Sequence, residues 1–171
     1  MNEQIKTKLK NFNIRFANED DAGLVLDFIK QLADYEKRPH EVVATETDIK
    51  EALFERKLIE VIISEFEGNP VGFALFFHNF STFLGKPGIY IEDLYVNPEM
   101  RGKGIGTLML AFLAGLALER KCGRVEWTVL KWNEPSIKFY EKMGAAPKDE
   151  WTLYKISGEE LKNLGKKFYK Y

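Results

Sequence analysis

Three polar side chains in the last third of the chain are spaced so that they could act together. Asn133, Ser136 and Tyr140 are separated by three and four residues, so a helix beginning near Asn133 places an amide, a hydroxyl and a phenol on one face. A phenol can protonate a departing thiolate, because their pKa values differ by roughly 1.5 units, or about 2 kcal/mol. In the structural alternative, Asn133 only caps the helix and Tyr140 is a core aromatic residue.

A glycine-rich turn between an expected strand and an expected helix forms the second candidate group. Residues 89–96 alternate β-branched and aromatic side chains, and residues 105–116 carry apolar side chains at helical spacing. The sequence between them includes Arg101-Gly-Lys-Gly-Ile-Gly106. Glycines let a phosphate approach the free N–H groups of a helix N-terminus, so the turn is expected to bind a phosphorylated ligand. The structural alternative is a tight turn with no ligand.

The glycine spacing excludes the two commonest phosphate motifs. A dinucleotide-binding turn needs a third glycine where this chain has Thr107, and a Walker loop needs serine or threonine where it has Gly104.

The strand before the turn offers a candidate base. A primary amine has a pKa of about 10.4, so it must lose a proton before it can act as a nucleophile at pH 7. Glu92 is the candidate acceptor, and the alternative is an exposed strand carboxylate. Asp93 is expected to face the opposite side of the strand unless a β-bulge reorients it.

Composition limits the classes of protein to consider. The chain has 171 residues, of which 45% are hydrophobic and 13% aromatic, as in one globular domain. A net charge of −1 with scattered basic residues gives no reason to expect a nucleic-acid partner. The single Cys122 and the lack of zinc-ligand spacing predict no metal and a cytoplasmic location, and the apolar runs are too short to span a membrane.

Hydrophobic periodicity and turn residues predict the order of elements. Strands are expected at 13–17, 59–66, 71–80, 87–96, 124–130 and 151–156, and helices at 18–36, 45–54, 104–121, 134–143 and after the capping box Ser157-x-x-Glu160. Residues 1–11 are expected to be a loose extension, and residues 12–171 one domain. The predicted fold class is α/β or α+β, with a mixed sheet and helices on both of its faces.

Several motifs together resemble a known family. The Arg-x-x-Gly-x-Gly pattern at 101–106 is similar to the pyrophosphate loop of the GNAT superfamily of N-acetyltransferases. Further motifs resemble its diamine (spermidine/spermine) acetyltransferase branch: Leu32–Glu36, Val71–Ala74, Tyr90–Asp93, Trp132–Ser136, Phe139–Tyr140 and Gly144–Ala145. The resemblance covers about residues 13–161. It implies a twisted sheet whose two central parallel strands splay apart, acetyl-coenzyme A as co-substrate, and a homodimer.

The resemblance also implies roles for individual residues. Tyr140 is expected to be the general acid, opposite Glu92 as the base. The residues expected to bind acetyl-coenzyme A are Leu94, Tyr95, Val96, Arg101, Gly102, Lys103, Gly104, Ile105, Gly106, Thr107, Asn133, Glu134, Pro135, Ser136 and Tyr140. The residues expected to contact the amine are Tyr35, Glu36, Glu92, Asp93, Glu126, Trp127, Thr128, Asp149 and Glu150. The acids among them suit a substrate that carries ammonium groups.

The acceptor stays open between alternatives, because the chain departs from the diamine branch in two loops. Residues 79–84 contain no acid where the branch has one, and the loop at 145–150 is short. The first hypothesis is transfer of acetyl to a small di- or polyamine. The second is the same reaction on a lysine-like amino acid or a protein amine. The third is a non-catalytic coenzyme-A-binding regulatory module, against which the presence of both Glu92 and Tyr140 argues.

Overall fold

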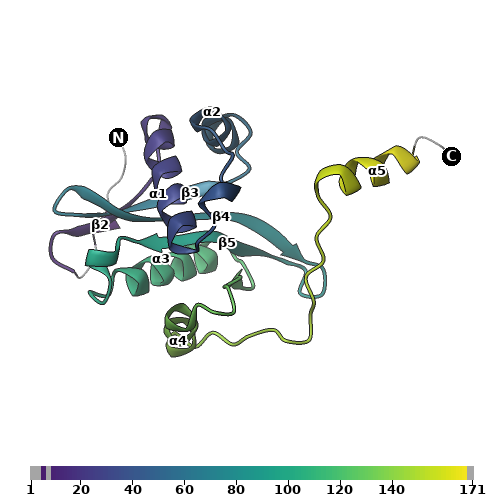
Figure 1. Cartoon of the computed structure of the whole chain (residues 1–171). Helices are drawn as coiled ribbons and strands as arrows, with labels where there is room; N and C mark the ends of the chain where they lie inside the picture. Colours follow the sequence, from purple (N-terminus) through teal and green to yellow (C-terminus); the bar gives the residue numbers. More distant parts are fainter. Residues whose placement is uncertain (1–4, 7–8, 169–171) are drawn as a thin grey trace. The chain divides into compact units, whose positions relative to one another are not determined.

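The computed structural model describes residues 5–6 and 9–168, and the chain divides into two compact units, residues 1–130 and 131–171. The first unit contains a β-sheet with helices packed on it. The second contains two helices joined by a segment without regular secondary structure. Figure 1 labels these elements along the chain.

The sheet has six strands, and their order in the sheet follows their order in the sequence. They are β1 (Ile5–Lys6), β2 (Phe12–Phe16), β3 (Glu60–Phe66), β4 (Asn69–Ser81), β5 (Lys86–Val96) and β6 (Val125–Trp127). Neighbours pair antiparallel except for β5 and β6, which are parallel. The mixed sheet predicted from the sequence is therefore confirmed. The expected loose extension needs a correction, because Ile5 pairs with Ile14 and so adds an edge strand to the sheet.

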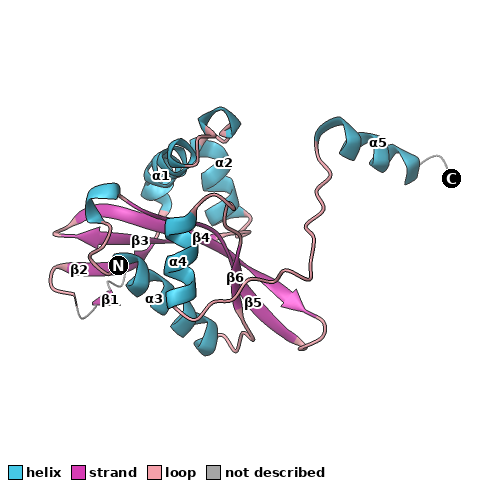
Figure 2. Cartoon of the chain, turned by 60° about the horizontal axis from the view of Figure 1, so that its bottom comes forward, coloured by secondary structure: helices cyan, strands magenta, loops and turns pink. Residues whose placement is uncertain are grey.

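Helices cover both faces of this sheet, as predicted. The α-helices of the first unit are α1 (Ala22–Tyr35), α2 (Glu46–Lys50) and α3 (Ile105–Glu119). They are accompanied by the 3-10 turns η1 (Glu19–Asp21), η2 (Pro39–Glu41) and η4 (Pro98–Met100) and the π-helical turn η3 (Glu51–Glu55). In Figure 1, α1 and α2 lie on one face of the sheet and α3 lies on the other. The second unit contributes α4 (Glu134–Lys142) and α5 (Gly158–Phe168), drawn in cyan in Figure 2.

Polar caps set the starts of the helical segments before α1 and at α2. The Asn18 side chain accepts a hydrogen bond from the backbone N–H of Asp20, and the Asp21 carboxylate accepts one from the N–H of Asn18. Thr45 and Asp48 form the same reciprocal arrangement. Both capping boxes satisfy N–H groups that a helix start leaves without a partner, which is why the acidic clusters marked these starts correctly.

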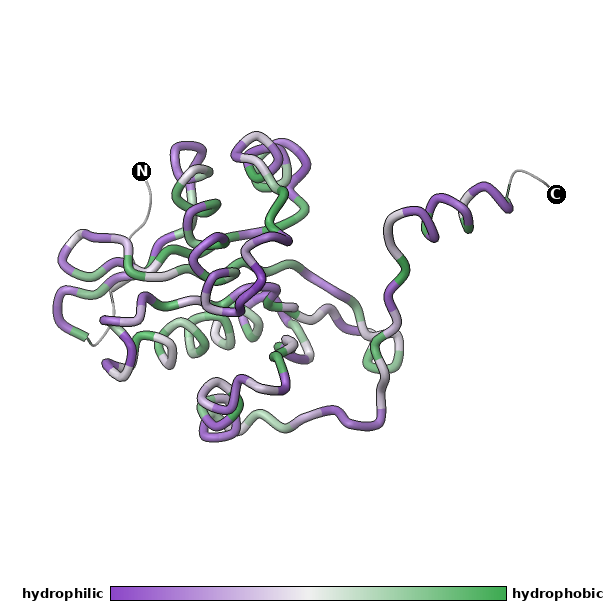
Figure 3. The backbone as a smooth tube through the Cα atoms, viewed as in Figure 1, coloured by the Kyte–Doolittle hydropathy of each residue, from purple (hydrophilic) through white to green (hydrophobic). Residues whose placement is uncertain are grey.

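The two faces of the sheet bury different cores. Phe28 of α1 stacks on Phe73 of β4 with ring centroids 5.4 Å apart, in the cluster that α1 and α2 cover. On the other face, Met109 and Leu113 of α3 are fully buried, and Phe112 contacts Phe16 edge to face at 6.0 Å. Figure 3 shows the difference: hydrophilic and hydrophobic residues alternate along α1, whereas α3 is apolar for most of its length. An amphipathic α1 and a largely apolar α3 therefore enclose the sheet.

Two predicted strands need correction. The strand expected at 124–130 contains only Val125–Trp127, because β6 pairs with β5 only as far as Ile91. The strand expected at 151–156 does not form, and these residues have no regular structure. Their alternating pattern satisfies strand propensity, but a strand also needs a neighbour to accept its backbone hydrogen bonds, and none pairs with this segment within the described residues.

Candidate active site

A β-bulge lies at Glu92, in the middle of β5. Phe76 of β4 pairs with Ile91 and Leu75 pairs with Asp93, so Glu92 is the extra residue without a partner in β4. Directly paired residues share a face of the sheet, and Leu75 belongs to the cluster beneath α1. Asp93 therefore lies on the α1 face, opposite Ile91. The β-bulge on which the orientation of Asp93 was expected to depend is therefore present.

The pairing of β5 with β6 ends at the same place. Ile91 and Trp127 are the last paired residues, and β5 continues for five residues to Val96. On this side of β5, the backbone of Leu94, Tyr95 and Val96 is therefore not paired with β6. Two parallel strands that part in this way leave backbone donors and acceptors available to a ligand. The parting of the parallel strands implied by the resemblance is confirmed.

Two carboxylates act on a third, Asp93, beside the bulge. Burial, followed by the negative charges of Glu92 and Glu36, raises the pKa of Asp93 from 3.8 to about 7. Burial is also the main reason that the pKa of Glu36 is raised. Glu36 is the C-cap of α1 and Glu92 is exposed at the bulge. This cluster has a surplus of negative charge that an ammonium group would compensate.

The glycine-rich turn has the backbone that a phosphate-binding loop needs. Gly102 and Gly104 have φ values of 76° and 85°, in the left-handed region where other residues are strained. A Cβ atom at either position would meet no atom of the described chain within 4 Å, so the space above the backbone is open. Gly104 is the N-cap of the 15-residue α3 and supplies no side-chain cap. The first N–H groups of α3, from Ile105 to Thr107, can therefore bind an anion.

Arg101 does not direct its side chain as a simple phosphate ligand would. Its Nε donates a hydrogen bond to the carbonyl oxygen of Val96 at 2.9 Å. Its guanidinium carbon lies 4.4 Å from the ring centroid of Tyr35 and 5.6 Å from that of Tyr95. The guanidinium thus contacts the end of β5 and the end of α1.

The predicted contacts on β6 have partners of their own. The Glu126 carboxylate accepts a hydrogen bond from Asn79 Nδ2 at 2.8 Å and pairs with Arg124 at 2.6 Å. Its charge is thus compensated within the chain, unlike that of Asp93. Thr128 receives a hydrogen bond of 3.5 Å from the hydroxyl of Tyr90.

In the second unit, α4 carries Ser136 and Tyr140 and begins directly after Asn133. The Asn133 side chain caps α4 by accepting from the N–H of Ser136 at 3.4 Å, so the capping function proposed as its alternative is confirmed. Pro135 occupies the first turn, where its missing N–H costs nothing. Tyr140 lies one to two turns later, with its ring 5.3 Å from that of Phe139. Asp149 and Glu150 lie in an exposed turn after α4.

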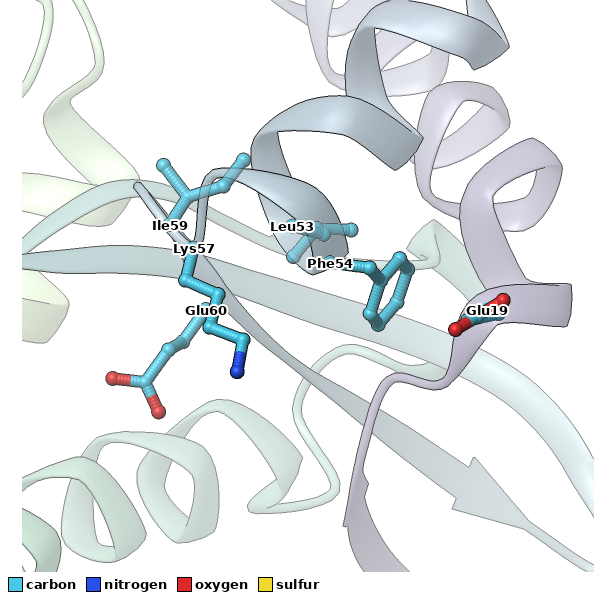
Figure 4. A pocket seen from close by; sticks show the side chains of 6 residues that line it. All are labelled: Glu19, Leu53, Phe54, Lys57, Ile59 and Glu60. Carbon is cyan, nitrogen blue, oxygen red and sulfur yellow. The ribbon is translucent and has the colours of Figure 1, made fainter.

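The described chain also has a groove of about 530 Å³ away from these residues. Its lining residues come from η1, η3, the segment between η3 and β3, and the start of β3: Glu19, Leu53, Phe54, Lys57, Ile59 and Glu60 (Figure 4). Arg120 binds Glu60 at 2.7 Å. None of the residues predicted for acetyl transfer lines this groove, so its volume alone does not make it the active site.

Two polar residues near the site were not singled out from the sequence. Tyr90 lies three residues before Asp93 and bonds to Thr128, and its signal was its place at the start of the motif Tyr90–Asp93. Gln31 accepts a hydrogen bond from the Tyr95 hydroxyl at 3.4 Å. Its signal was the spacing of four from Tyr35, which places both on one side of α1.

The described residues contain no group of three or more His, Cys, Asp or Glu side chains placed to hold a metal ion. None of their helices is long and apolar enough to cross a lipid bilayer.

Comparison with known proteins agrees with this geometry. Residues 27–145 match the model of the acetyltransferase (GNAT) family. A thialysine N-epsilon-acetyltransferase from Bos taurus is 35% identical over 90% of this chain and 97% of its own length. An L-ornithine N5-acetyltransferase from Arabidopsis thaliana is 31% identical over 90% of this chain and 87% of its own.

Solved structures share the fold. An integron cassette protein from the mobile metagenome of V. cholerae superposes with a TM-score of 0.78 and 26% identity, covering 92% of this chain and 99% of its own. A predicted acetyltransferase from Clostridium acetobutylicum, solved with acetyl-CoA, has a TM-score of 0.67 and 24% identity over 84% of this chain and 96% of its own.

Proposed function

Because the chain belongs to the acetyltransferase (GNAT) family, we propose that it acetylates the terminal primary amine of a small basic molecule, with acetyl-coenzyme A as the donor. The observation that carries the proposal is the carboxylate cluster of Glu36, Glu92 and Asp93, which lies where β5 leaves β6. The cluster attracts an ammonium group, and the unpaired part of β5 offers its backbone to the donor.

The proposed acceptor is a lysine- or ornithine-like amino acid. Two relatives at 30% identity or more are named for thialysine and L-ornithine. Each of these amines is short and carries a second charged group. The loop at 79–84 contains no acid, which agrees with an acceptor shorter than a polyamine. A di- or polyamine is the second candidate, because the same carboxylates would bind its ammonium groups.

The donor is expected to bind along β5 and the glycine-rich turn. Leu94, Tyr95 and Val96 have backbone groups not paired with β6, and the N–H groups of 102–107 suit a pyrophosphate. Acetyl-coenzyme A would supply the activated acetyl thioester. Asn133, Glu134, Pro135 and Ser136 remain predicted contacts on the second unit.

The proposed chemistry needs one proton acceptor and one proton donor. The acceptor amine must be deprotonated, and Asp93 is suited to this because its pKa of about 7 lets it take up and release a proton near neutral pH. The sequence pointed to Glu92 instead, and Glu92 is proposed here as the charge that tunes Asp93. Tyr140 is proposed as the donor to the departing thiolate. The homodimer, the cytoplasmic location and the domain limits at 12 and 171 stay predictions.

An amine panel tests the function. The purified protein is given acetyl-coenzyme A with lysine, thialysine, ornithine, putrescine or spermidine, and free coenzyme A is measured with a thiol reagent. The highest kcat/KM is expected with thialysine or ornithine. A higher value with spermidine would move the acceptor to the polyamines, and no thiol release with any amine would favour a non-catalytic binding module.

A glycine variant tests the phosphate-binding turn. Gly104→Val is a poor probe, because the φ of 85° would strain any valine and lower stability by itself. Gly106 is the second residue of α3, and alanine has the higher helix propensity, by up to about 1 kcal/mol in a helix interior. Gly106→Ala is therefore expected to unfold at the same or a higher temperature while binding coenzyme A about tenfold more weakly, by calorimetry. Gly115→Ala, later in α3, is the matched control. Equal affinity in both variants would contradict the phosphate assignment.

A further inference from the structure

We infer that Arg101 is a positioning residue that ties the donor-binding end of β5 to the C-terminal end of α1. The inference rests on the proposed function, because it assigns the two ends to the donor and to the amine. It replaces the expectation that the Arg101 charge binds the phosphates directly.

The first contact fixes the loop between β5 and the glycine-rich turn. Arg101 Nε donates to the carbonyl of Val96, the last residue of β5, at 2.9 Å. The residues between them form the 3-10 turn η4, and the N–H of Arg101 bonds to the carbonyl of Pro98. This hydrogen bond makes residues 96–101 a closed loop, so the end of the strand and the start of the turn move together.

The second contact reaches α1. A guanidinium is planar and can lie against aromatic rings, and that of Arg101 lies 4.4 Å from the centroid of Tyr35 and 5.6 Å from that of Tyr95. Tyr95 is anchored in the core, near Phe28 of α1, with ring centroids 6.2 Å apart. Tyr35 is the last residue of α1. One side chain therefore joins a fixed strand residue to the end of a helix.

The two aromatic residues that Arg101 contacts, Tyr35 and Tyr95, are each close in the sequence to an acid of the carboxylate cluster. Glu36 directly follows Tyr35, and Asp93 precedes Tyr95 by two residues on the same face of β5. The charge of Glu36 acts on Asp93, so the separation of α1 and β5 affects the acids proposed to bind the amine. Loss of the tie should therefore weaken binding of the amine, whereas loss of a phosphate contact should weaken binding of the donor alone.

Arg101→Lys distinguishes a positioning role from direct binding of the phosphates. Lysine keeps the positive charge but has neither a planar group nor an Nε–H in a fixed position. The experiment measures the KM for acetyl-coenzyme A and for the best amine of the panel in Arg101→Lys, Arg101→Met, Tyr35→Leu and Tyr35→Phe. Arg101→Lys is expected to raise the KM for the amine by about tenfold, the scale of one cation–π contact together with a charged hydrogen bond. Tyr35→Leu leaves the hydrogen bond to Val96 in place, so its effect should be smaller, about threefold to fivefold. Tyr35→Phe keeps the ring that Arg101 contacts, so it should raise the KM for the amine less than Tyr35→Leu does. Arg56→Lys, at an exposed arginine elsewhere, is the control.

The double variant tests the connection itself. Arg101→Lys combined with Tyr35→Leu is expected to cost less than the sum of the two single changes, because both remove the contact between Arg101 and Tyr35. Additive effects of the two changes on the KM for the amine would overturn the inference. It would also be overturned if Arg101→Met raised only the KM for acetyl-coenzyme A while Arg101→Lys had the KM values of the wild type. If the Arg101 variants do not fold, equal amine KM values in Tyr35→Leu and Tyr35→Phe would overturn it as well.

Failure of the proposed function would look different. A wild-type protein that releases no thiol with any amine refutes the function but leaves the tie measurable. In that case the coupling between Arg101→Lys and Tyr35→Leu is taken from their free energies of unfolding in urea. Non-additive values support the tie, and additive values overturn it.

Discussion

Tyr140→Phe is expected to lower kcat on the order of 100-fold while the KM for acetyl-coenzyme A stays within a few-fold, the usual scale for losing one general acid. The change removes only a hydroxyl, and Phe keeps the ring that contacts Phe139 on α4. Without the phenol, the departing thiolate must leave unprotonated, so the loss should fall on turnover. Steady-state kinetics with the best amine of the panel measures both constants.

The leaving group gives an independent check on this role. A donor whose thiol has a lower pKa needs less help from an acid, so the deficit of Tyr140→Phe should shrink when acetyl is offered on an aromatic thiol. Tyr154→Phe is the matched control, because the Tyr154 side chain is exposed on the same unit. A Tyr140→Phe enzyme with the wild-type rate would make Tyr140 a packing residue and place the acid elsewhere.

Local chemistry explains why most elements could be predicted from the sequence. The helical segments beginning after Asn18 and Thr45 have caps whose hydrogen bonds join residues within three positions of each other. Their starts can therefore be predicted from neighbouring residues in the sequence. The hairpin of β3 and β4 turns at Glu67 and Gly68, both with positive φ. Features of this kind need no knowledge of distant parts of the chain.

The errors arose where a distant partner decides the outcome. The alternation at 151–156 predicts a strand, but a strand forms only against a neighbour, and the sequence does not say whether one is present. The length of β6 is set by β5, which bulges at Glu92 and stops pairing after Ile91. Likewise, the resemblance placed Arg101 with the phosphate loop, whereas its contacts with Tyr35 and Val96 depend on the packing of α1 against the sheet.

In the candidate site, too, some features follow from neighbouring residues and others from distant parts of the chain. Glu92 and Asp93 were found from their types and position in the strand, but which of them is the less exposed depends on the register of β4 and β5. A strand without a bulge would put them on opposite faces. The bulge places Asp93 over the α1 core near Glu36 and leaves Glu92 exposed, and this changes which carboxylate is the better base.

Asp93→Asn is expected to lower kcat/KM at pH 7 by on the order of 100-fold or more, and to remove a step in its pH dependence. The base must be deprotonated, so with a pKa of about 7 the wild-type kcat/KM should rise with pH through about 7 and then level. Asparagine cannot accept the proton, so the variant should lack this rise. The kcat/KM of the variant should recover only as pH approaches the pKa of the amine itself, about 10.4.

The stability of Asp93→Asn provides a readout that does not depend on activity. The folded pKa of about 7 lies above the ordinary value of 3.8, so between these pH values the folded protein binds more protons than the unfolded chain. The free energy of unfolding of the wild type should therefore fall as pH rises from about 4 to about 7, with a limiting slope near 1.4 kcal/mol per pH unit. Asparagine has no proton to lose, so this contribution should be absent from the variant.

Glu92→Gln tests which of the two carboxylates, Glu92 or Asp93, is the general base. The charge of Glu92 raises the pKa of Asp93, so its removal should lower that pKa and move the rise in kcat/KM to a lower pH, leaving the plateau largely intact. If Glu92 were the base instead, Glu92→Gln would abolish the rise and Asp93→Asn would only shift it. A third outcome, in which either change raises only the KM for the amine and leaves kcat unchanged at every pH, would reduce both acids to binding groups, because uniform binding affects KM alone. The direction of the pH shift in Glu92→Gln is thus the most informative single measurement. The rise in kcat/KM moves to lower pH only if Asp93 is the base.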